Sequence, residues 1–185
     1  MRHIQHVSND TGFTLIETLV AVLLLSFCLV PIVSILTRTL TITTLSQQRF
    51  TATKIALQGV ELIRNKRDNN ILCTQTATCP GGITDWKDGL IGTWEPDVTD
   101  ISAYYPGQRF DIASNRKICI STQGGTLAGR YTYCDGSQER PLPGDFTRVV
   151  RVTDESAYSV AVECTVTWTG GQSFVLNTVL FKVTK

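Results

Sequence analysis

The chain has 185 residues, with 17 Lys and Arg against 16 Asp and Glu, so its formal net charge is only +1. A chain so close to neutral has no basic field to recruit nucleic acid, and we expect no nucleic-acid partner. The sequence contains no C-x-x-C pair, no phosphate-binding glycine loop and no G-x-S-x-G elbow. We therefore expect a protein that is not an enzyme and that uses no cofactor.

The first element along the chain is an apolar run of about 24 residues, 13–36. As an α-helix it would be roughly 36 Å long, which is enough to cross a hydrocarbon core of about 30 Å. A secretory signal would have an apolar stretch of only about 7 to 15 residues, with its cleavage site after it. Here the only nearby glycine, Gly12, precedes the run. We predict one transmembrane helix, in which Pro31 causes a kink or a local opening rather than an end.

A single carboxylate, Glu17, lies in this apolar run. At a bilayer centre it would cost about 2.5 to 3.5 kcal/mol, so an intramembrane glutamate suggests a function. The simpler interpretation is a polar residue near the end of a plain anchor, which snorkels to the interface. The surrounding residues favour a function, because they read Gly12-Phe13-Thr14-Leu15-Ile16-Glu17.

This hexapeptide, followed by a hydrophobic helix, resembles the start of type IV pilin and pseudopilin precursors. The resemblance implies that a membrane prepilin peptidase cleaves after Gly12 and that Phe13 becomes N-methylated. Glu17 matches the family's acidic position. Its implied role is to attract the charged terminus of an adjacent subunit, because opposite charges interact more strongly in an apolar assembly than in water. The implied partners are other pilin subunits, prepilin peptidase, an inner-membrane assembly platform and membrane lipid.

The resemblance also divides the chain. Residues 1–12 are expected to be the leader peptide, 13–36 the transmembrane helix, 37–68 its amphipathic continuation and 69–185 an extracytoplasmic, β-rich globular domain. The leader would stay in the cytoplasm, although the positive-inside signal is weak because Asp10 opposes Arg2. Both histidines, His3 and His6, lie in the leader. The mature chain would thus lack the commonest general base and metal ligand, and we expect no metal site.

Beyond the membrane segment, apolar residues continue at intervals of mostly three and four, which predicts a helix with one buried face. These residues are Leu40, Leu45, Ala52, Ile55, Ala56, Gly59, Val60 and Ile63. A polar cluster from Arg64 to Asn70 suggests that the helix stops near Arg67. The cations Arg64, Lys66 and Arg67 could contact phosphates, but we favour the interpretation that they complement the dipole in the last helical turn.

The segment 73–115 is rich in Gly, Pro, Asp and Thr, and we predict mostly loops with short elements. Its aromatic residues could form a partner or glycan surface, but we expect them to cover a small core. They are Trp86, Trp94, Tyr104, Tyr105 and Phe110. Four carboxylates suggest a calcium site, but they follow no EF-hand spacing, so we interpret them as solvated loop residues. They are Asp85, Asp88, Asp97 and Asp100.

Two cysteine pairs are candidate disulfides. The segments 116–122 and 130–135 predict a hairpin around Gly124 and Gly125, in which Cys119 and Cys134 can meet across the strands. That bridge would close a loop of about 15 residues and contribute about 3 kcal/mol. Cys73 and Cys79 are expected to staple a short loop after the helix. Both bridges require an oxidising compartment, in agreement with export of this domain.

The strongest strand pattern is 158–168, where apolar residues alternate with polar ones. Cys164 lies on the apolar face, so we expect a buried free thiol rather than a redox centre. The segments 146–153 and 173–183 should complete an antiparallel meander, with Gly170 and Gly171 in the last turn. We expect this sheet to lie against the helix, which gives an α+β, pilin-like fold.

The C-terminal pattern around 148–152 and 166–168 resembles PilV-like minor pilins and minor pseudopilins of type II secretion. We therefore predict a minor pilin, held in the inner membrane as a single-pass precursor and then inserted into a pilus or pseudopilus. A minor pseudopilin of a type II secretion system shares all the N-terminal features. A third possibility is an exported binding domain or enzyme that the helix only tethers to the membrane.

Overall fold

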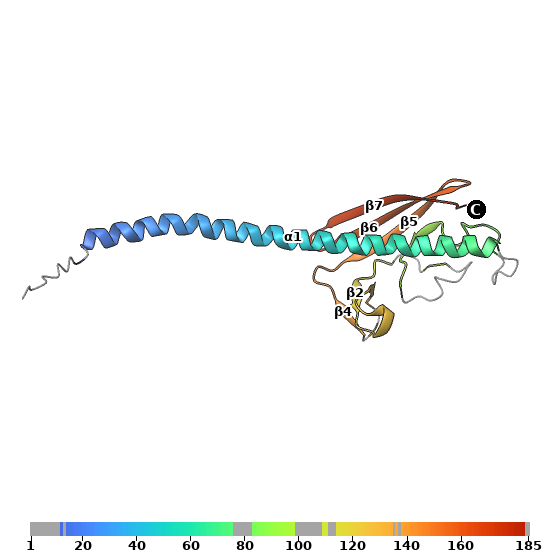
Figure 1. The fold of residues 1–185 in the computed structure, drawn as a ribbon, viewed down its shortest axis with the longest axis horizontal. Coiled ribbons are helices and arrows are strands. Elements are labelled where there is room, and N and C mark those ends of the chain that lie inside the picture. The colour runs from blue at the N-terminus through green and yellow to red at the C-terminus, as the bar shows by residue number, and fades with distance from the viewer. Residues whose placement is uncertain are drawn as a thin grey trace, which may run out of the picture. The chain divides into compact units, whose positions relative to one another are not determined.

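The computed structural model describes residues 12, 14–75, 83–98, 109–110, 114–134, 136 and 138–183. The chain divides into two compact units, Met1–Ser46 and Gln47–Lys185. Figure 1 shows the long helix α1, the three long strands and the smaller sheet.

Helix α1 extends from Leu15 to Gln75, a length of 61 residues, and continues through Pro31. The prediction that Pro31 does not end the helix is confirmed. The prediction that the helix stops near Arg67 is wrong, since α1 continues for two more turns. The reason is a tertiary contact: the side chain of Asn70 is buried and donates hydrogen bonds to the carbonyls of Trp86 (3.0 Å) and Asp88 (2.8 Å). Such contacts outweigh the weak helix propensity of asparagine.

The three cations near this point therefore do not lie in a last helical turn, and that interpretation is also wrong. Arg64 pairs with Glu61 on the helix surface. Arg67 pairs with Asp68, at 2.6 Å. Lys66 is fully buried, with its Nζ 6.0 Å from the centre of the Phe110 ring.

A four-stranded sheet forms the larger β-structure of the unit Gln47–Lys185. Its strands are β1 (Gly92–Trp94), β5 (Thr147–Ser156), β6 (Ser159–Trp168) and β7 (Gln172–Phe181), in the order β1-β5-β6-β7. All neighbouring strands are antiparallel. The predicted meander of three strands is confirmed, and β1 adds a short strand at one edge.

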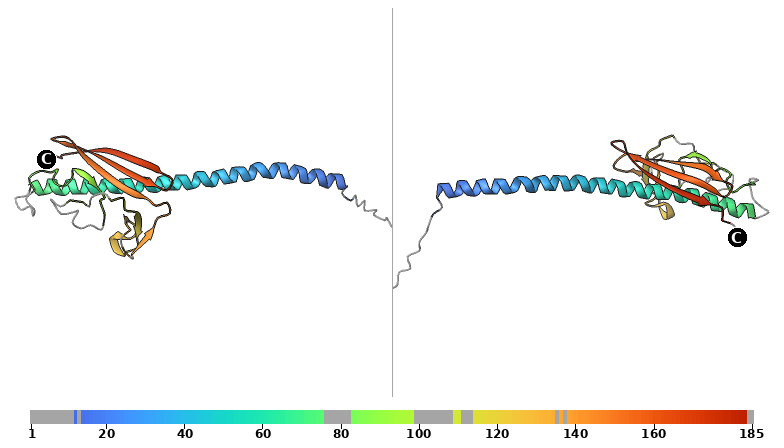
Figure 2. Two further views of the ribbon diagram at one scale, coloured as in Figure 1. Left: turned by 180° about the vertical axis from the view of Figure 1, so that it is seen from behind. Right: turned by 90° about the horizontal axis from the view of Figure 1, so that it is seen from above.

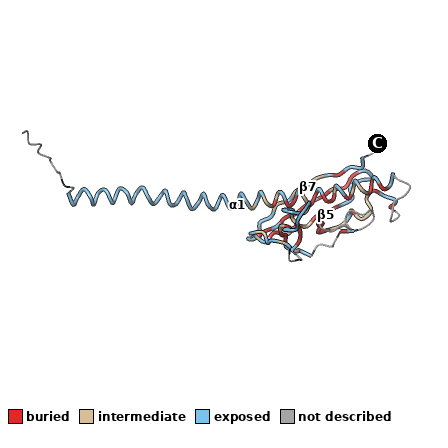
Figure 3. Tube along the Cα trace, turned by 60° about the horizontal axis from the view of Figure 1, so that its bottom comes forward, coloured by how far each residue is buried: buried red, intermediate tan, exposed pale blue. Residues whose placement is uncertain are grey.

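The core of this unit lies between the sheet and one face of α1. Buried helix residues, among them Ile55, Ala56 and Ile63, share one cluster with strand residues such as Val150 and Cys164. Figure 2 shows β5, β6 and β7 alongside the later part of α1, and Figure 3 shows buried residues on that part. The prediction that the sheet lies against the helix is confirmed. Cys164 is a buried free cysteine, as expected.

Gly59 lies where the helix and the sheet approach each other closely. A Cβ atom there would lie 2.9 Å from Cδ of Arg148, 3.2 Å from Sγ of Cys164 and 3.3 Å from Cγ2 of Val150. Real Cβ contacts this short are rare. Because glycine has no Cβ atom, α1 can pack this close to β5 and β6 at Gly59.

A second sheet has the strands β2 (Ile118–Ser121), β3 (Tyr131–Tyr133) and β4 (Glu139–Pro141), in the order β3-β2-β4. A 3₁₀ turn, η2 (Gly125–Leu127), lies between β2 and β3. The predicted antiparallel hairpin is confirmed, although its strands are shorter than the predicted segments 116–122 and 130–135. Asp135 lies outside the described residues. Cys119 and Cys134 form the expected disulfide, with Cα atoms 5.2 Å apart. Cys73 is disulfide-bonded. Its expected partner, Cys79, lies outside the described residues, so that pairing stays a prediction.

Three of the five loop aromatics lie in the described segments, and all three are core residues, as predicted. Trp86, Trp94 and Phe110 expose 2%, 6% and 3% of their surface. Tyr104 and Tyr105 lie outside the described residues.

Candidate processing and assembly site

The predicted cleavage and assembly residues lie at the start of α1. Gly12 is exposed, and Phe13 lies outside the described residues. The carbonyl of Thr14 accepts hydrogen bonds from the backbone N–H groups of Glu17 (3.0 Å) and Thr18 (3.2 Å), so Thr14 is the N-cap residue directly before Leu15. Glu17 is exposed and lies in the first helical turn. A carboxylate there also complements the positive end of the helix dipole, a role that the sequence analysis did not consider.

The segment that follows Glu17 is apolar on all sides. Residues 18–37 contain no charged side chain. Large apolar side chains around the helix are exposed, from Leu15 at 79% through Phe27 at 73% to Leu36 at 60%. Among the described residues, α1 is the one helix long and apolar enough to cross a membrane. A surface of this kind is stable only in lipid or against other apolar surfaces.

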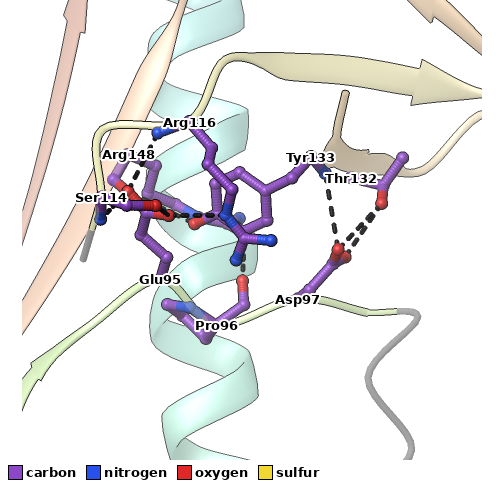
Figure 4. Close-up of polar contacts among 8 residues, drawn as sticks. All are labelled: Glu95, Pro96, Asp97, Ser114, Arg116, Thr132, Tyr133 and Arg148. Atoms are coloured by element: carbon purple, nitrogen blue, oxygen red, sulfur yellow. Dashed lines mark hydrogen bonds and ion pairs between the residues drawn. The ribbon is translucent and has the colours of Figure 1, made fainter. Parts of the chain in front are cut away.

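A second concentration of polar groups lies within the unit Gln47–Lys185 and is buried (Figure 4). Its first part is Glu95, whose side chain is completely buried beside Arg116. The Glu95 carboxylate accepts hydrogen bonds from Nε of Arg116 (2.8 Å), from the backbone N–H of Ser114 (2.8 Å) and from the backbone N–H of Arg116 (3.1 Å). Burial alone would raise the pKa of Glu95. The hydrogen bonds from Arg116 and Ser114 outweigh that effect and hold the pKa below its ordinary value.

The second part is Arg148, a fully buried cation on β5. Its guanidinium donates to the carbonyl of Ile55, at 3.3 Å, and to the carbonyl of Pro96. It also lies over the ring of Tyr133, 5.4 Å from the ring centre. Burial, only partly offset by Arg148, raises the pKa of Tyr133 to about 12, so this phenol stays protonated at neutral pH. Arg148 therefore joins α1, β5 and the segment after β1.

The third part is Asp97, which the sequence analysis placed among solvated loop carboxylates. That interpretation is wrong, because Asp97 exposes only 5% of its surface and accepts a hydrogen bond from the Thr132 hydroxyl, at 3.0 Å. Asp88 has a local role, since it accepts backbone N–H bonds from Thr84 and Asp85, both at 3.2 Å. Asp100 lies outside the described residues. Within the described ranges, no group of three or more His, Cys, Asp or Glu could hold a metal ion.

The buried cluster has the geometry of a structural clamp. Its groups hold the segments 95–97 and 114–116 against β3, β5 and α1. Sequence reasoning missed Glu95 and Arg116, for which no local pattern exists. It could have found Arg148, because the alternation of β5 places this residue on the same inward face as Val150 and Val152.

Comparison with known families gives one match. Residues 7–33 match the model of the prokaryotic N-terminal methylation motif. This segment contains Gly12, Phe13 and Glu17 and the first part of the apolar helix. No curated protein and no solved structure matches the chain. The motif supports the type IV pilin superfamily and a pilin-like or pseudopilin substrate of prepilin peptidase. It also fits a membrane-anchored precursor of a filament subunit, and a structural protein rather than an enzyme.

Proposed function

We propose that this chain is a minor pilin, a structural and assembly subunit of a type IV pilus-like filament. The observation that carries the proposal is the methylation motif at residues 7–33, which includes the start of a helix whose apolar side chains are exposed all round. Cleavage and methylation by prepilin peptidase account for the motif. Assembly into a filament accounts for the apolar helix, because its surface can pass from lipid into a bundle of similar helices without exposure to water.

Three residues have specific roles in this proposal. Prepilin peptidase cleaves the peptide bond after Gly12, a residue that is exposed, and the new terminal amine of Phe13 becomes methylated. The carboxylate of Glu17, in the first turn of α1, then attracts the charged terminus of a neighbouring subunit. This pairing offsets the insertion cost of Glu17, which is about 2.5 to 3.5 kcal/mol at a bilayer centre.

The proposal includes a topology and a set of partners. The leader faces the cytoplasm, and the unit Gln47–Lys185 is exported. The disulfide between Cys119 and Cys134 supports export, because such bonds persist in oxidising compartments. The partners are prepilin peptidase, an inner-membrane assembly platform and other pilins.

The proposal is tested by intact mass and N-terminal sequencing of the chain from two fractions, membranes and sheared surface filaments. We expect a chain that begins with N-methylated Phe13 in the filament fraction. The same terminus in membranes alone, with loss of protein secretion on deletion, would identify a minor pseudopilin of a type II secretion system instead. A chain that keeps Met1, or is cut elsewhere, would contradict both and leave a tethered exported domain.

Two variants separate processing from assembly. Gly12→Leu should block cleavage, which gel mobility and mass measure, and normal processing of this variant would refute the assignment. Glu17→Val should be cleaved normally but should be absent from filaments. Thr18→Ala is the matched control, because the Thr18 hydroxyl bonds only locally, to the Leu15 carbonyl at 2.8 Å. Equal incorporation of the Glu17 variant and the control would contradict the pairing role.

A further inference from the structure

Strand β7 is a long edge strand without the usual protection. It has ten residues, and among the described residues it pairs only with β6. Its sequence, Gln172–Phe181, contains no charged residue and no proline. Natural proteins normally protect a sheet edge with charges, prolines, bulges or very short strands, because open backbone groups recruit another strand. The opposite edge follows this rule, since β1 has only three residues.

The register of β7 shows which of its backbone groups are open. The N–H of Lys182 donates to the carbonyl of Tyr158, at 2.8 Å, one position beyond the pair Ser159 and Phe181. Hydrogen-bonded and non-hydrogen-bonded positions alternate in an antiparallel ladder. The even-numbered residues of β7 therefore direct their backbone N–H and C=O groups toward β6. The odd-numbered residues direct their N–H and C=O groups to the free edge. The carbonyl of Phe181 already accepts a hydrogen bond from Arg67, at 3.4 Å, so the open part ends before it.

The side chains at these odd positions are exposed and largely apolar. Val175 and Val179 are 46% and 40% exposed, and Asn177 lies exposed between them. A partner for this edge must meet two requirements. It must be an extended backbone, which can pair with the open N–H and C=O groups, and it must carry uncharged, apolar side chains that pack beside Val175 and Val179. Strand β7 of a second copy meets both requirements, because it is extended, carries exposed apolar side chains and contains no charged residue.

We propose that β7 pairs with β7 of a second copy of this chain, antiparallel and centred on Asn177. In this register Asn177 lies opposite Asn177 of the second copy, and each Val175 lies opposite a Val179. These three pairs are hydrogen-bonded positions, which gives about six backbone hydrogen bonds. The interface is isologous, so it closes as a dimer with one continuous sheet.

The direction of β7 determines how the two copies of the later part of α1 are directed in this dimer. Strand β7 follows the hairpin beside Gly144, where a Cβ atom would lie 3.7 Å from Nε2 of Gln48, and it ends at Phe181 beside Arg67. It therefore runs in the same direction as the part of α1 between residues 48 and 67. Antiparallel pairing of β7 directs the two copies of this part of α1 in opposite senses. The pairing itself is independent of processing at Gly12.

Cysteine cross-linking tests the pairing and its register in the full chain, purified in detergent micelles, with Cys28→Ser as background. Chains with Val175→Cys mixed with chains with Val179→Cys should form disulfide-linked dimers about tenfold faster than either chain alone. Their Cα atoms would be about 5.5 Å apart, within the range for a disulfide, whereas two cysteines at position 175 would be more than about 14 Å apart. Thr153→Cys, exposed on β5, is the collision control. Equal rates for the mixed pair, the single variants and this control would overturn the proposal.

Charge at the centre of the interface gives a second readout. Asn177→Lys places like charges directly opposite each other and should abolish the cross-link in the background of Val175→Cys and Val179→Cys. Mixing Asn177→Lys chains with Asn177→Glu chains should restore it. If the cross-linking rate is the same with and without these charges, β7 does not pair with itself in this register.

Failure of either cross-linking experiment would leave the processing and incorporation results for Gly12 and Glu17 unaffected, so the two proposals fail separately.

Discussion

Replacing Gly59 by alanine tests the packing of α1 on the sheet, because two effects of opposite sign compete there. Alanine in the interior of a helix is favoured over glycine by about 1 kcal/mol. Against this, the new Cβ would lie 2.9 Å from Cδ of Arg148 and 3.2 Å from Sγ of Cys164. Overpacking of a core typically costs about 1 to 3 kcal/mol. The sign of the net effect depends on whether Arg148 can move.

The contacts of Arg148 indicate that it cannot move freely. Its side chain is fully buried, and its guanidinium is held by the carbonyls of Ile55 and Pro96. We therefore place the overpacking cost at the upper end of its range. We expect Gly59→Ala to lower the free energy of unfolding by about 1 to 2 kcal/mol, which lowers Tm by roughly 3 to 8 °C for a unit of this size.

The measurement is thermal unfolding of the full chain in micelles, followed by tryptophan fluorescence. All three tryptophans lie in the unit Gln47–Lys185, so the signal reports that unit. Leu57→Ala, on the exposed side of the same helix, is the control and should change the free energy of unfolding by less than about 0.5 kcal/mol. Cys164→Ala should partly relieve the Gly59 variant in a double-mutant cycle, with a coupling of about 0.5 kcal/mol or more. An unchanged or raised Tm for Gly59→Ala would refute the reasoning.

Two further predictions concern the exported unit. Glu95→Gln should lower its stability by about 2 kcal/mol near neutral pH, because a buried, charge-assisted set of hydrogen bonds is lost. The pKa of Glu95 is depressed in the folded state, so its contribution is full above the unfolded pKa and is lost as pH falls through the folded pKa. The gap between wild type and Glu95→Gln should therefore be constant above about pH 5 and shrink below about pH 4.3, and a gap independent of pH down to acid unfolding would contradict this. Replacing both Cys119 and Cys134 by serine removes a bridge between residues 15 positions apart and should lower stability by about 3 kcal/mol in a denaturant titration, whereas a loss near zero would show that the bridge constrains little.

Local sequence patterns were enough to predict the apolar N-terminal helix and the C-terminal strands. The hexapeptide from Gly12 to Glu17 and the apolar run after it predict processing and a membrane helix, because both signals lie in consecutive residues. Alternation with period two predicts β5, β6 and β7 to within a few residues, and it places Cys164 in the core. The strand predictions succeed because each of these strands buries one face, and alternate positions along the sequence mark that face.

The tertiary structure alone decided the features that depend on distant partners. Helix α1 continues to Gln75 because Asn70 finds acceptors on a loop that comes later in the chain. Strands β1 and β4 are too short to show a pattern and exist because β5 and β2 offer them an edge. Glu95 lies in a loop and looks like a solvated residue in the sequence, until Ser114 and Arg116 surround it. Buried charge is stable only where its partners are already in place, and only the fold brings those partners together.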